Sequence, residues 1–414
     1  MKKLLLLLAA GQFAGAQPGV PAVDYVVPAA VQPFASDPAT IWYDSFDDPG
    51  ALDRYLEKIS TPDLFYLTSE QAYGGAGLSL KGLFREGTVS AGSLKVAFGD
   101  SPLARVQART GEKFTEIYWR IYVKHQRGWT GNPAKLSRAT ILAGANWSQA
   151  MIAHVWGAGN ATPFLTLDPA TGIDAAGRLA TVKYNDFDHL RWLGYKPFGE
   201  YPVFATPESG KWVSVEAAAR LNTPGASDGT FRLWIDGRLD AFRDGLNWRG
   251  TWDERGINAV FLENYWNDGS PVEQARYFDD FVVSTRPIGL ARAPLNPEIV
   301  KTTFESADGG MQGAFEVQVA TACELETVWQ SGAIAGEGNR VTVDGQNGLF
   351  RGPLEGAAAL APDTRYAARA RQGDRAGRWS EWSPWRVVIH TVAEGAAENA
   401  GRAHVMVEPR KVQK

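Results

Sequence analysis

The fold is decided by a stretch in which buried-type and polar side chains alternate, Glu116-Ile117-Tyr118-Trp119-Arg120-Ile121-Tyr122-Val123-Lys124. The isoleucine, tryptophan and valine side chains occupy every second position, so in an extended strand they all point to one side. The positions between them are polar or aromatic. This period of two predicts a strand that has one face in a hydrophobic core and the other face turned away from it.

The same alternation recurs outward from this stretch. Residues 212–222 repeat it, and Asp236-Gly237 is a strong hairpin signal after residues 231–236. Further strands are predicted at residues 139–143, 149–156, 257–266 and 276–285. Because no segment shows a sustained helical repeat with caps at both ends, we expect an all-β protein. Residues 41–289 then form one large antiparallel β-sandwich of two sheets.

A smaller module follows the first one. The proline-containing segment 290–297 is predicted to be a linker, and residues 298–392 contain several short strands, which is the size of an immunoglobulin-like sandwich. Residues 17–40 are rich in Pro and Ala and are predicted to be a linker or a strap across the first domain. The polar tail, residues 393–414, is predicted to be disordered.

The N-terminus has the features of a secretory signal peptide. Lys2 and Lys3 precede an apolar run, and Ala14-Gly15-Ala16 fits a small-residue cleavage site, so residues 1–16 are the predicted signal peptide. The apolar run is shorter than the roughly 20 residues of a membrane span. We therefore expect a secreted or periplasmic protein without membrane insertion.

Composition excludes some classes of function. The formal net charge of -4 gives no electrostatic reason to expect a nucleic-acid partner. The only cysteine is Cys323, so no intrachain disulfide can form, and we expect this residue to be a small buried side chain. The 15 tryptophans could fill sandwich cores or line a sugar-binding surface, and composition alone does not decide between these two uses.

The second module resembles fibronectin type III domains over residues 296–392. The likeness is carried by Leu360-Ala361-Pro362, by Thr364-Arg365-Tyr366 and by Trp379-Ser380-Glu381-Trp382-Ser383. The last of these matches a motif in which tryptophan rings interleave with arginines such as Arg369 and Arg371. The resemblance implies either a partner-binding patch or a structural brace, and the brace is the favoured interpretation.

The first domain resembles the concanavalin A-like lectin and glucanase jelly rolls over residues 42–289. Within that group it is most similar to polysaccharide lyases of the heparin lyase I type. The carrying segments are residues 210–222, residues 228–237 with Asp228-Gly229 and Asp236-Gly237, and residues 277–285. The resemblance implies a jelly roll with one sheet surface that holds a polysaccharide. It identifies the fold better than it identifies a reaction, so a catalytic centre does not follow from it.

Two groups of residues are candidates for binding a glycan. Tyr118 and Lys124 belong to a row with spacing two, so the side chains stand roughly 7 Å apart along the strand. Aromatic rings can cover sugar C–H groups, and cations pair with uronate or sulfate groups. Asn264 and Trp266, near a strand end, are predicted to join the same groove. The alternative is the solvated outer face of a sheet with ordinary cross-strand pairs.

Lyase chemistry needs a group that neutralises the uronate carboxylate, a base and an acid. Arg120 is the candidate neutraliser, Tyr122 or Tyr265 the base or acid, and His154 the second partner. The alternative for His154 is a histidine with a purely structural role. His125, at the end of its strand, is expected in an exposed loop. Glycoside hydrolysis is disfavoured because Glu263 has no second carboxylate at a suitable spacing.

A calcium site is a further hypothesis. Asp47 near the first strand and Asp280 in the last one could meet, because these two ends of the chain pair in jelly rolls, and Ca²⁺ prefers carboxylate and carbonyl oxygens. The alternative is that these acids cap turns. No cofactor is required by any other motif.

The sequence thus supports three functions. The leading hypothesis is an exported protein whose jelly-roll groove binds a polysaccharide, with an acidic one the best match to its arginines and lysines. The first alternative is an active polysaccharide lyase that cleaves uronate-containing glycans by β-elimination. The second alternative is a structural or adhesive protein of the cell envelope without catalysis. The sequence does not predict the oligomeric state.

Overall fold

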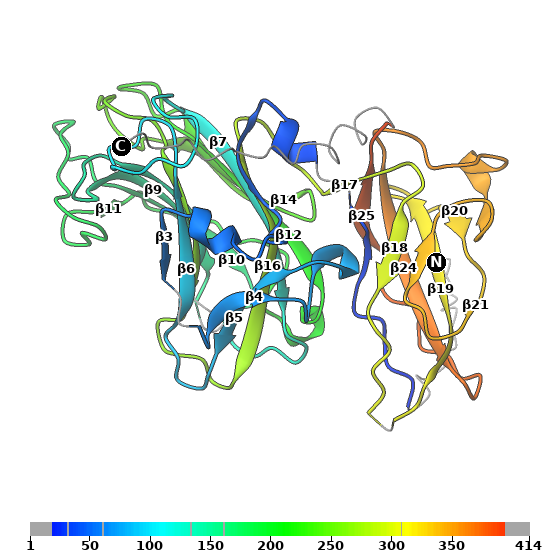
Figure 1. Ribbon diagram of the computed structural model, residues 1–414. Coiled ribbons are helices and arrows are strands. Elements are labelled where there is room, and N and C mark those ends of the chain that lie inside the picture. The colour runs from blue at the N-terminus through cyan, green and yellow to red at the C-terminus, as the bar shows by residue number, and fades with distance from the viewer. Residues whose placement is uncertain are drawn as a thin grey trace, which may run out of the picture.

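The computed structural model describes residues 19–30, 33–59, 62–132, 135–159, 162–307 and 309–393. The predicted signal peptide and the tail beyond residue 393 lie outside these residues. The described chain is built almost entirely of strands, which form two lobes of layered antiparallel sheets (Figure 1). The predicted all-β class is therefore confirmed.

The first domain contains an eight-stranded sheet, here called sheet I. Its strands, in order across the sheet, are β14 (Arg238–Leu246), β13 (Gly229–Ile235), β12 (Trp212–Arg220), β7 (Glu116–His125), β16 (Gln274–Ser284), β5 (Ser79–Phe84) and β4 (Phe65–Thr68). The eighth strand, β2 (Thr40–Asp44), pairs with β16.

A seven-stranded sheet, sheet II, packs against sheet I. Its order is β11 (Arg191–Trp192), β10 (Leu165–Thr171), β9 (Gln149–Gly157), β8 (Lys135–Leu142), β15 (Ala259–Tyr265), β6 (Ser90–Ala97) and β3 (Glu57–Ile59). The described 3-10 helices are short: η1 (Pro33–Ser36), η2 (Ala51–Arg54), η3 (Tyr73–Gly75), η4 (Thr206–Glu208) and η5 (Gly352–Leu354).

The core of the first domain lies between the two sheets. Trp119 of β7 and Val155 of β9 belong to one hydrophobic cluster, with 1% and 0% of their surfaces exposed. The apolar face predicted for residues 116–124 is thus confirmed as the core face of β7. The outer face of each sheet, the one turned away from this core, is where a ligand could bind.

The second domain is also a sandwich. One sheet has the order β17 (Arg292–Ala293), β25 (Arg386–Thr391), β24 (Arg365–Asp374), β19 (Gln312–Thr321), β20 (Thr327–Gln330) and β23 (Leu349–Phe350), with β21 (Ile334–Ala335) paired to β19. The other contains β1 (Val26–Pro28), β18 (Glu298–Lys301) and β22 (Arg340–Thr342). The segment predicted as a linker, 290–297, includes β17, and Ala293 is part of the second core.

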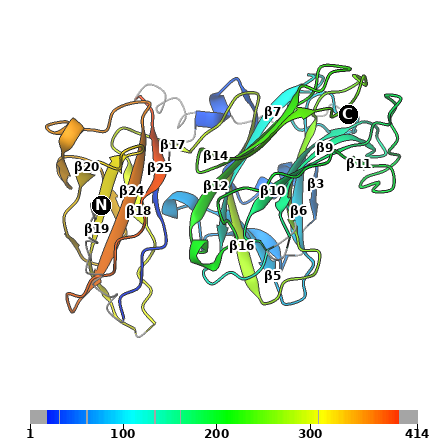
Figure 2. The ribbon, with the colours of Figure 1, turned by 180° about the vertical axis from the view of Figure 1, so that it is seen from behind.

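The described part of the predicted linker or strap up to residue 30, here called the strap, lies between the two domains. Its strand β1 pairs with β18 of the second domain, and Val26 packs into the second core. Tyr25 and Val27 instead contact residues of sheet I such as Tyr122. The dark blue strap can be followed along the second lobe in both ribbon views (Figure 2).

The predicted ladder of tryptophans and arginines in the second domain is confirmed. The guanidinium carbon of Arg371 lies 4.9 Å from the ring centre of Trp379 and 4.7 Å from that of Trp382. Arg369 lies 4.8 Å from Trp382 and 4.3 Å from Trp385. The ladder braces β24 against the segment before β25. Membership of the fibronectin type III family stays a prediction, and Cys323 is exposed and not buried as expected.

Replacing Arg371 by glutamine is expected to lower the free energy of unfolding by about 1–2 kcal/mol, because two cation–π contacts and the ion pair with Glu316 are lost together. Arg375→Gln is the matched control. It breaks a pair with Glu337 in which both side chains are more than half exposed, so a loss below about 0.5 kcal/mol is expected. Urea unfolding followed by tryptophan fluorescence measures both, and equal losses would contradict a bracing ladder.

His125 is a buried residue of β7 and not the exposed loop residue that we expected. Its ring centre lies 4.6 Å from that of Trp129 and 5.2 Å from that of Phe204, and its Nε2 atom is buried without a hydrogen-bond partner. Burial, and next the charge of Arg276, hold the pKa of His125 well below 6.5. The folded protein therefore keeps this imidazole neutral when the unfolded chain would protonate it.

His125→Phe is expected to make the protein less sensitive to acid. In the wild type this residue costs up to about 1.4 kcal/mol of stability for each pH unit below 6.5, because unfolding then binds a proton. The variant loses only this contribution, so its stability should fall less steeply than that of the wild type between pH 6.5 and 5. Chemical unfolding at several pH values tests this, and parallel curves would contradict it.

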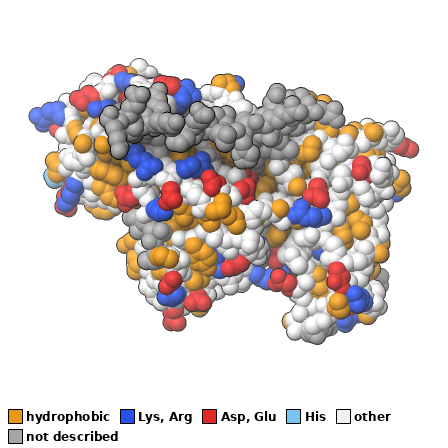
Figure 3. Space-filling model, in the orientation of Figure 1, with side chains coloured by type: hydrophobic (Ala, Val, Ile, Leu, Met, Phe, Trp, Pro, Cys, Tyr) orange, Lys and Arg blue, Asp and Glu red, His pale blue; other side chains and the backbone are white. Residues whose placement is uncertain are grey.

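The surface charges are mixed. On the face shown in Figure 3, Lys and Arg side chains of the described residues lie among Asp and Glu side chains instead of forming one basic surface.

Candidate functional site

The residues predicted to form one catalytic centre lie on two different sheets. Arg120 and Tyr122 are in β7 of sheet I, whereas His154 is in β9 and Tyr265 is in β15 of sheet II. Because the core fills the space between the sheets, the two pairs face opposite surfaces of the first domain. The predicted centre made of all four residues is therefore wrong.

Arg120 and Tyr122 lie at the boundary between the domains. The Arg120 guanidinium donates to the backbone oxygens of Asp280 (3.3 Å) and Gly289 (3.4 Å). The Tyr122 hydroxyl accepts from the Ala291 amide at 2.8 Å, and its ring stacks on Tyr73 at 4.0 Å. Both side chains are buried, so neither can meet a glycan.

The other two members of this row, Tyr118 and Lys124, differ in their burial. The Lys124 ammonium donates to the Gln71 side chain at 2.5 Å and lies 4.3 Å from the ring centre of Tyr25 in the strap. Burial lowers the pKa of Lys124 to about 8. Tyr118 is half-buried and donates to Glu116 at 2.9 Å. Burial closes Arg120, Tyr122 and Lys124 of the predicted row to a glycan, whereas a binding role for Tyr118 stays a prediction.

Asn264 and Trp266 also point away from solvent. The Asn264 side-chain oxygen accepts from Arg276 Nε at 2.8 Å, and its nitrogen donates to the Ala91 carbonyl at 3.3 Å. Trp266 packs in a buried cluster with Phe84 and Trp129. Alternation along β15 turns both residues inward and Tyr265 outward, so the prediction that they bind a glycan is wrong.

The two predicted calcium ligands act as acceptors for protein groups. Asp47 Oδ1 accepts from the Leu78 amide at 2.9 Å, and Asp280 Oδ1 accepts from the Tyr43 hydroxyl at 3.2 Å. Within the described residues, no group of three or more His, Cys, Asp or Glu side chains is arranged to hold a metal ion. The calcium site stays a prediction.

A row of mostly charged side chains crosses the outer face of sheet II at one level. Each member stands directly opposite the next on the neighbouring strand. The polar row, from β10 to β3, is Asp168, His154, Arg138, Phe261, Lys95 and Glu57. Residues paired in this way have Cβ atoms about 5 Å apart, so neighbouring side chains of the row can contact each other across the whole sheet.

Most cations on this face are already compensated by acids. Arg138 Nη2 lies 2.5 Å from Glu263 Oε1, and the side chains of Tyr184 and Asn185 also accept from this guanidinium. Lys95 pairs with an acid of the same row at 2.8 Å, and Lys196 pairs with Asp168 at 2.6 Å. A buried pair of this kind fixes side-chain positions more than it adds stability.

Lys135 differs from these cations. It makes no ion pair within the part of the chain that the structure describes, and its ammonium lies 4.3 Å from the ring centre of Tyr265 and 5.4 Å from that of Trp156. Tyr265 is 36% exposed. Trp156 stands opposite Lys135 across the strand pair and is half-buried. A cation between two accessible aromatic rings is therefore available to an anionic sugar.

His154 is held in one tautomer. Its Nδ1 atom lies 2.9 Å from the Asp168 carbonyl, which can only accept, so Nδ1 carries the proton. Burial, and next the charge of Arg138, lower the pKa of His154 well below 6.5, so the ring is neutral at pH 7. The Nε2 atom then presents a lone pair, and it has no hydrogen-bond partner. The ring centres of Trp156 and Trp192 lie 3.9 and 5.5 Å from the ring centre of His154.

Sequence reasoning found His154 and Tyr265 but missed most of their neighbours. Lys135 and Arg138 precede the segment predicted as a strand, and a bulge between Lys135 and Ser137 breaks the alternation that would have revealed them. Tyr184 comes from a loop without periodicity. Glu263 was noted only as an isolated carboxylate, and its role as the partner of Arg138 has no signal in the sequence.

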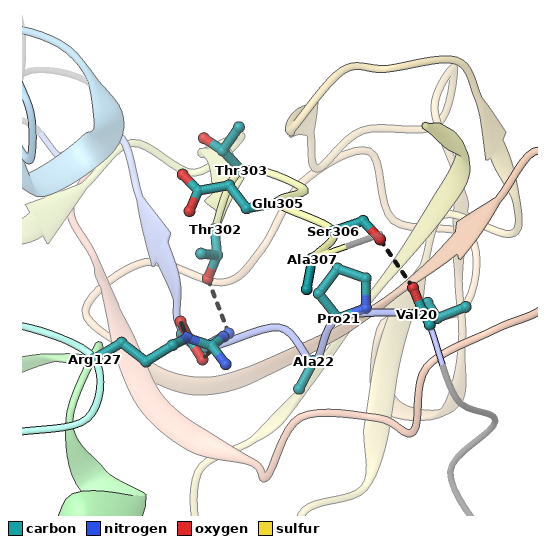
Figure 4. A pocket seen from close by; sticks show the side chains of 11 residues that line it. Val20, Pro21, Ala22, Arg127, Thr302, Thr303, Glu305, Ser306 and Ala307 are labelled. Atoms are coloured by element: carbon teal, nitrogen blue, oxygen red, sulfur yellow. Dashed lines mark hydrogen bonds and ion pairs between the residues drawn. The ribbon is translucent and has the colours of Figure 1, made fainter. Parts of the chain in front are cut away.

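A separate cavity of about 600 Å³ lies beside the strap. Figure 4 shows Thr302, Thr303 and Glu305 along one wall and the strap residues Pro21 and Ala22 along the other. The one cation that lines it, Arg127, is paired with Asp24. The described lining of the cavity thus has no unpaired cation for an anionic sugar, whereas sheet II has Lys135, so sheet II is the better candidate site.

No helix among the described residues has the length and hydropathy needed to cross a membrane.

Comparisons with known proteins give weak similarities. No protein-family model matches the chain, and no curated protein matches it significantly. Among solved structures, an endo-β-1,4-glucuronan lyase from the fungus Trichoderma reesei is 13% identical, with a TM-score of 0.41 over 60% of this chain and 96% of its own. The PL-14 alginate lyase from Aplysia kurodai is 14% identical, with a TM-score of 0.40 over 60% of this chain and 99% of its own. Similarity at this level does not assign an activity.

Proposed function

We propose that this chain binds an acidic polysaccharide on the outer face of sheet II. Lys135 carries the proposal, because its half-buried ammonium has no ion pair with any described residue and lies between the rings of Trp156 and Tyr265. Aromatic rings cover the apolar C–H faces of sugars, and an ammonium pairs with a carboxylate or sulfate. Trp192, which is 37% exposed, extends the aromatic surface toward β11.

The proposal includes export. A polysaccharide substrate of this kind is met outside the cytoplasm, which agrees with the signal peptide predicted at residues 1–16. The oligomeric state has no part in the proposal, because every group that it uses belongs to one copy of sheet II.

A second function, cleavage of the bound glycan by β-elimination, is favoured by His154. Neutral Nε2 would take the C5 proton of a uronate whose carboxylate is paired with Lys135. The electron pair left on C5 forms the C4–C5 double bond, and the bond from C4 to the bridging oxygen breaks. That oxygen then takes a proton from a phenol, a role that we assign to Tyr265. Because Nε2 is buried, substrate binding has to displace one of the flanking rings of Trp156 and Trp192.

A panel of glycans tests binding. Calorimetric titration with alginate, glucuronan and heparin, and with a neutral glucan, is expected to give binding only to acidic chains. Lys135→Ala should weaken that binding by about tenfold or more, which corresponds to about 1.4 kcal/mol. Lys113→Ala, which removes a lysine paired with Asp253, is the matched control and should bind as the wild type does.

Cleavage is measured separately. The unsaturated uronate formed by β-elimination absorbs in the ultraviolet, so a rising absorbance with any acidic glycan supports lyase activity. Binding without a rise supports recognition alone. The absence of both with every glycan contradicts the proposal and favours a structural or adhesive role.

A further inference from the structure

Three basic side chains stand side by side at one edge of the second domain. Arg292 of β17 is paired with His390 of β25, and His390 is paired with Arg365 of β24. Side chains of residues paired in this way lie on the same face of the sheet with Cβ atoms about 5 Å apart. The arrangement places two guanidinium groups on either side of one imidazole.

None of the three has a carboxylate partner within the described residues. Arg365 donates only to the Gly237 carbonyl at 3.4 Å, and Arg292 lies 5.6 Å from the ring centre of Phe34. Arg292 Nε and His390 Nδ1 are buried atoms without a hydrogen-bond partner. Other arginines of the second domain do pair with acids: Arg340, Arg371, Arg375, Arg378 and Arg386.

The nearest acids do not compensate this row fully. Asp363 lies close enough to act on His390 electrostatically, but it forms no ion pair with it. Glu216 of the first domain acts on Arg365 in the same way, yet its carboxylate oxygens accept from the amides of Ile288 and Gly289 at 2.9 and 2.8 Å. Protonation of His390 would place like charges directly opposite each other on neighbouring strands, which is destabilising, so a further anion would stabilise this edge.

We propose that Arg292, His390 and Arg365 form a binding site for a small oxyanion at the boundary between the two domains. Guanidinium groups match the geometry of sulfate, phosphate and carboxylate, because each can donate two parallel hydrogen bonds. Arg365 is exposed and the other two are half-buried, so an anion from solution can reach them. The site is separate from the outer face of sheet II and does not depend on the function proposed for it.

Anion binding at this site is coupled to pH through His390. Burial, and next the charges of Arg365 and Arg292, lower the pKa of His390, whereas Asp363 raises it. A bound anion opposes the effect of the two arginines and favours the protonated ring. The affinity for an oxyanion therefore increases as the pH falls toward the lowered pKa of His390, where the third cation forms.

Thermal unfolding of the full chain at constant ionic strength tests the proposal. Replacing chloride by sulfate or phosphate is expected to raise the melting temperature in proportion to the logarithm of the anion concentration. In Arg365→Gln and Arg292→Gln, about ten times more anion or more should be needed for the same rise in melting temperature. Arg351→Gln, at an exposed arginine of the same domain, is the matched control.

Further measurements identify the anion and show whether the variants fold. Glucuronate in place of sulfate distinguishes an acidic sugar from an inorganic anion as the occupant. His390→Asn should still bind sulfate at pH 8 but lose the increase in affinity at lower pH. Because Arg365 is exposed, its variant should fold as the wild type does. A sulfate effect that is the same as that of chloride, or the same in Arg365→Gln as in the wild type, overturns the proposal.

Discussion

Replacing His154 by asparagine is expected to lower the rate of β-elimination by about 10²–10⁴-fold, the range associated with loss of a general base. Asparagine can still donate to the Asp168 carbonyl, so the hydrogen bond that orients this position is kept. Its amide oxygen is far too weakly basic to take the C5 proton, which is the role that we assign to Nε2 of His154. Because Lys135, Trp156 and Tyr265 are untouched, the affinity for the glycan should stay within about threefold of the wild type, a difference of roughly 0.7 kcal/mol.

The control for this prediction lies on the opposite sheet. Tyr118→Phe removes a hydroxyl from the outer face of sheet I and should leave the rate unchanged. The initial rate of absorbance increase measures turnover, and calorimetry measures binding. If the asparagine variant keeps most of the wild-type rate, His154 is not the base. If Tyr118→Phe lowers the rate as strongly, the site has been placed on the wrong sheet.

The fold could be predicted from the sequence because alternation depends on a local property. Burial of every second residue in β7 needs only a core on one side, and Ile117 and Trp119 report that directly. The sequence also placed His154 and Trp156 on one face of β9, and the structure agrees. Each of these predictions concerns neighbours along one strand.

The site could not be predicted as well, because it depends on which face of each sheet stays open. Arg120 and Lys124 resemble a binding row in the sequence, yet both are buried, Arg120 against the Asp280 carbonyl and Lys124 against Gln71 and the strap residue Tyr25. A strand pattern distinguishes the core face from the outer face, but it does not show what packs on the outer face afterwards. Arg138 and Glu263 come from strands far apart in the chain, and only the strand order β8–β15 brings them together.

The covered face of sheet I leads to the second large effect. A chain that ends at Gly289 is expected to lose its solubility, because it exposes the buried cluster at the domain boundary. The aromatic members of that cluster on the first domain are Tyr73, Tyr122, Trp212 and Tyr277. Each aromatic side chain buries about 150–250 Å². Exposure of even part of this area gives a patch on the order of 500 Å², more than the few hundred Å² of contiguous apolar surface that monomeric soluble proteins usually expose.

The free energy of burial also favours the full chain over the shortened one. At about 25 cal/mol for each Å², a patch on the order of 500 Å² corresponds to a loss on the order of 10 kcal/mol of favourable burial. The shortened chain also loses the partner strand of β1, so the strap no longer has a sheet to join. Arg120 keeps its bond to the Asp280 carbonyl, but its neighbour Tyr122 loses the Ala291 amide.

Sedimentation velocity and binding of a hydrophobic dye measure this outcome. The shortened chain should form large particles and bind the dye, whereas a chain that ends at Ala393 keeps every described contact and should remain monodisperse. If the chain that ends at Gly289 sediments as one small species and melts at the wild-type temperature, burial at the boundary contributes little.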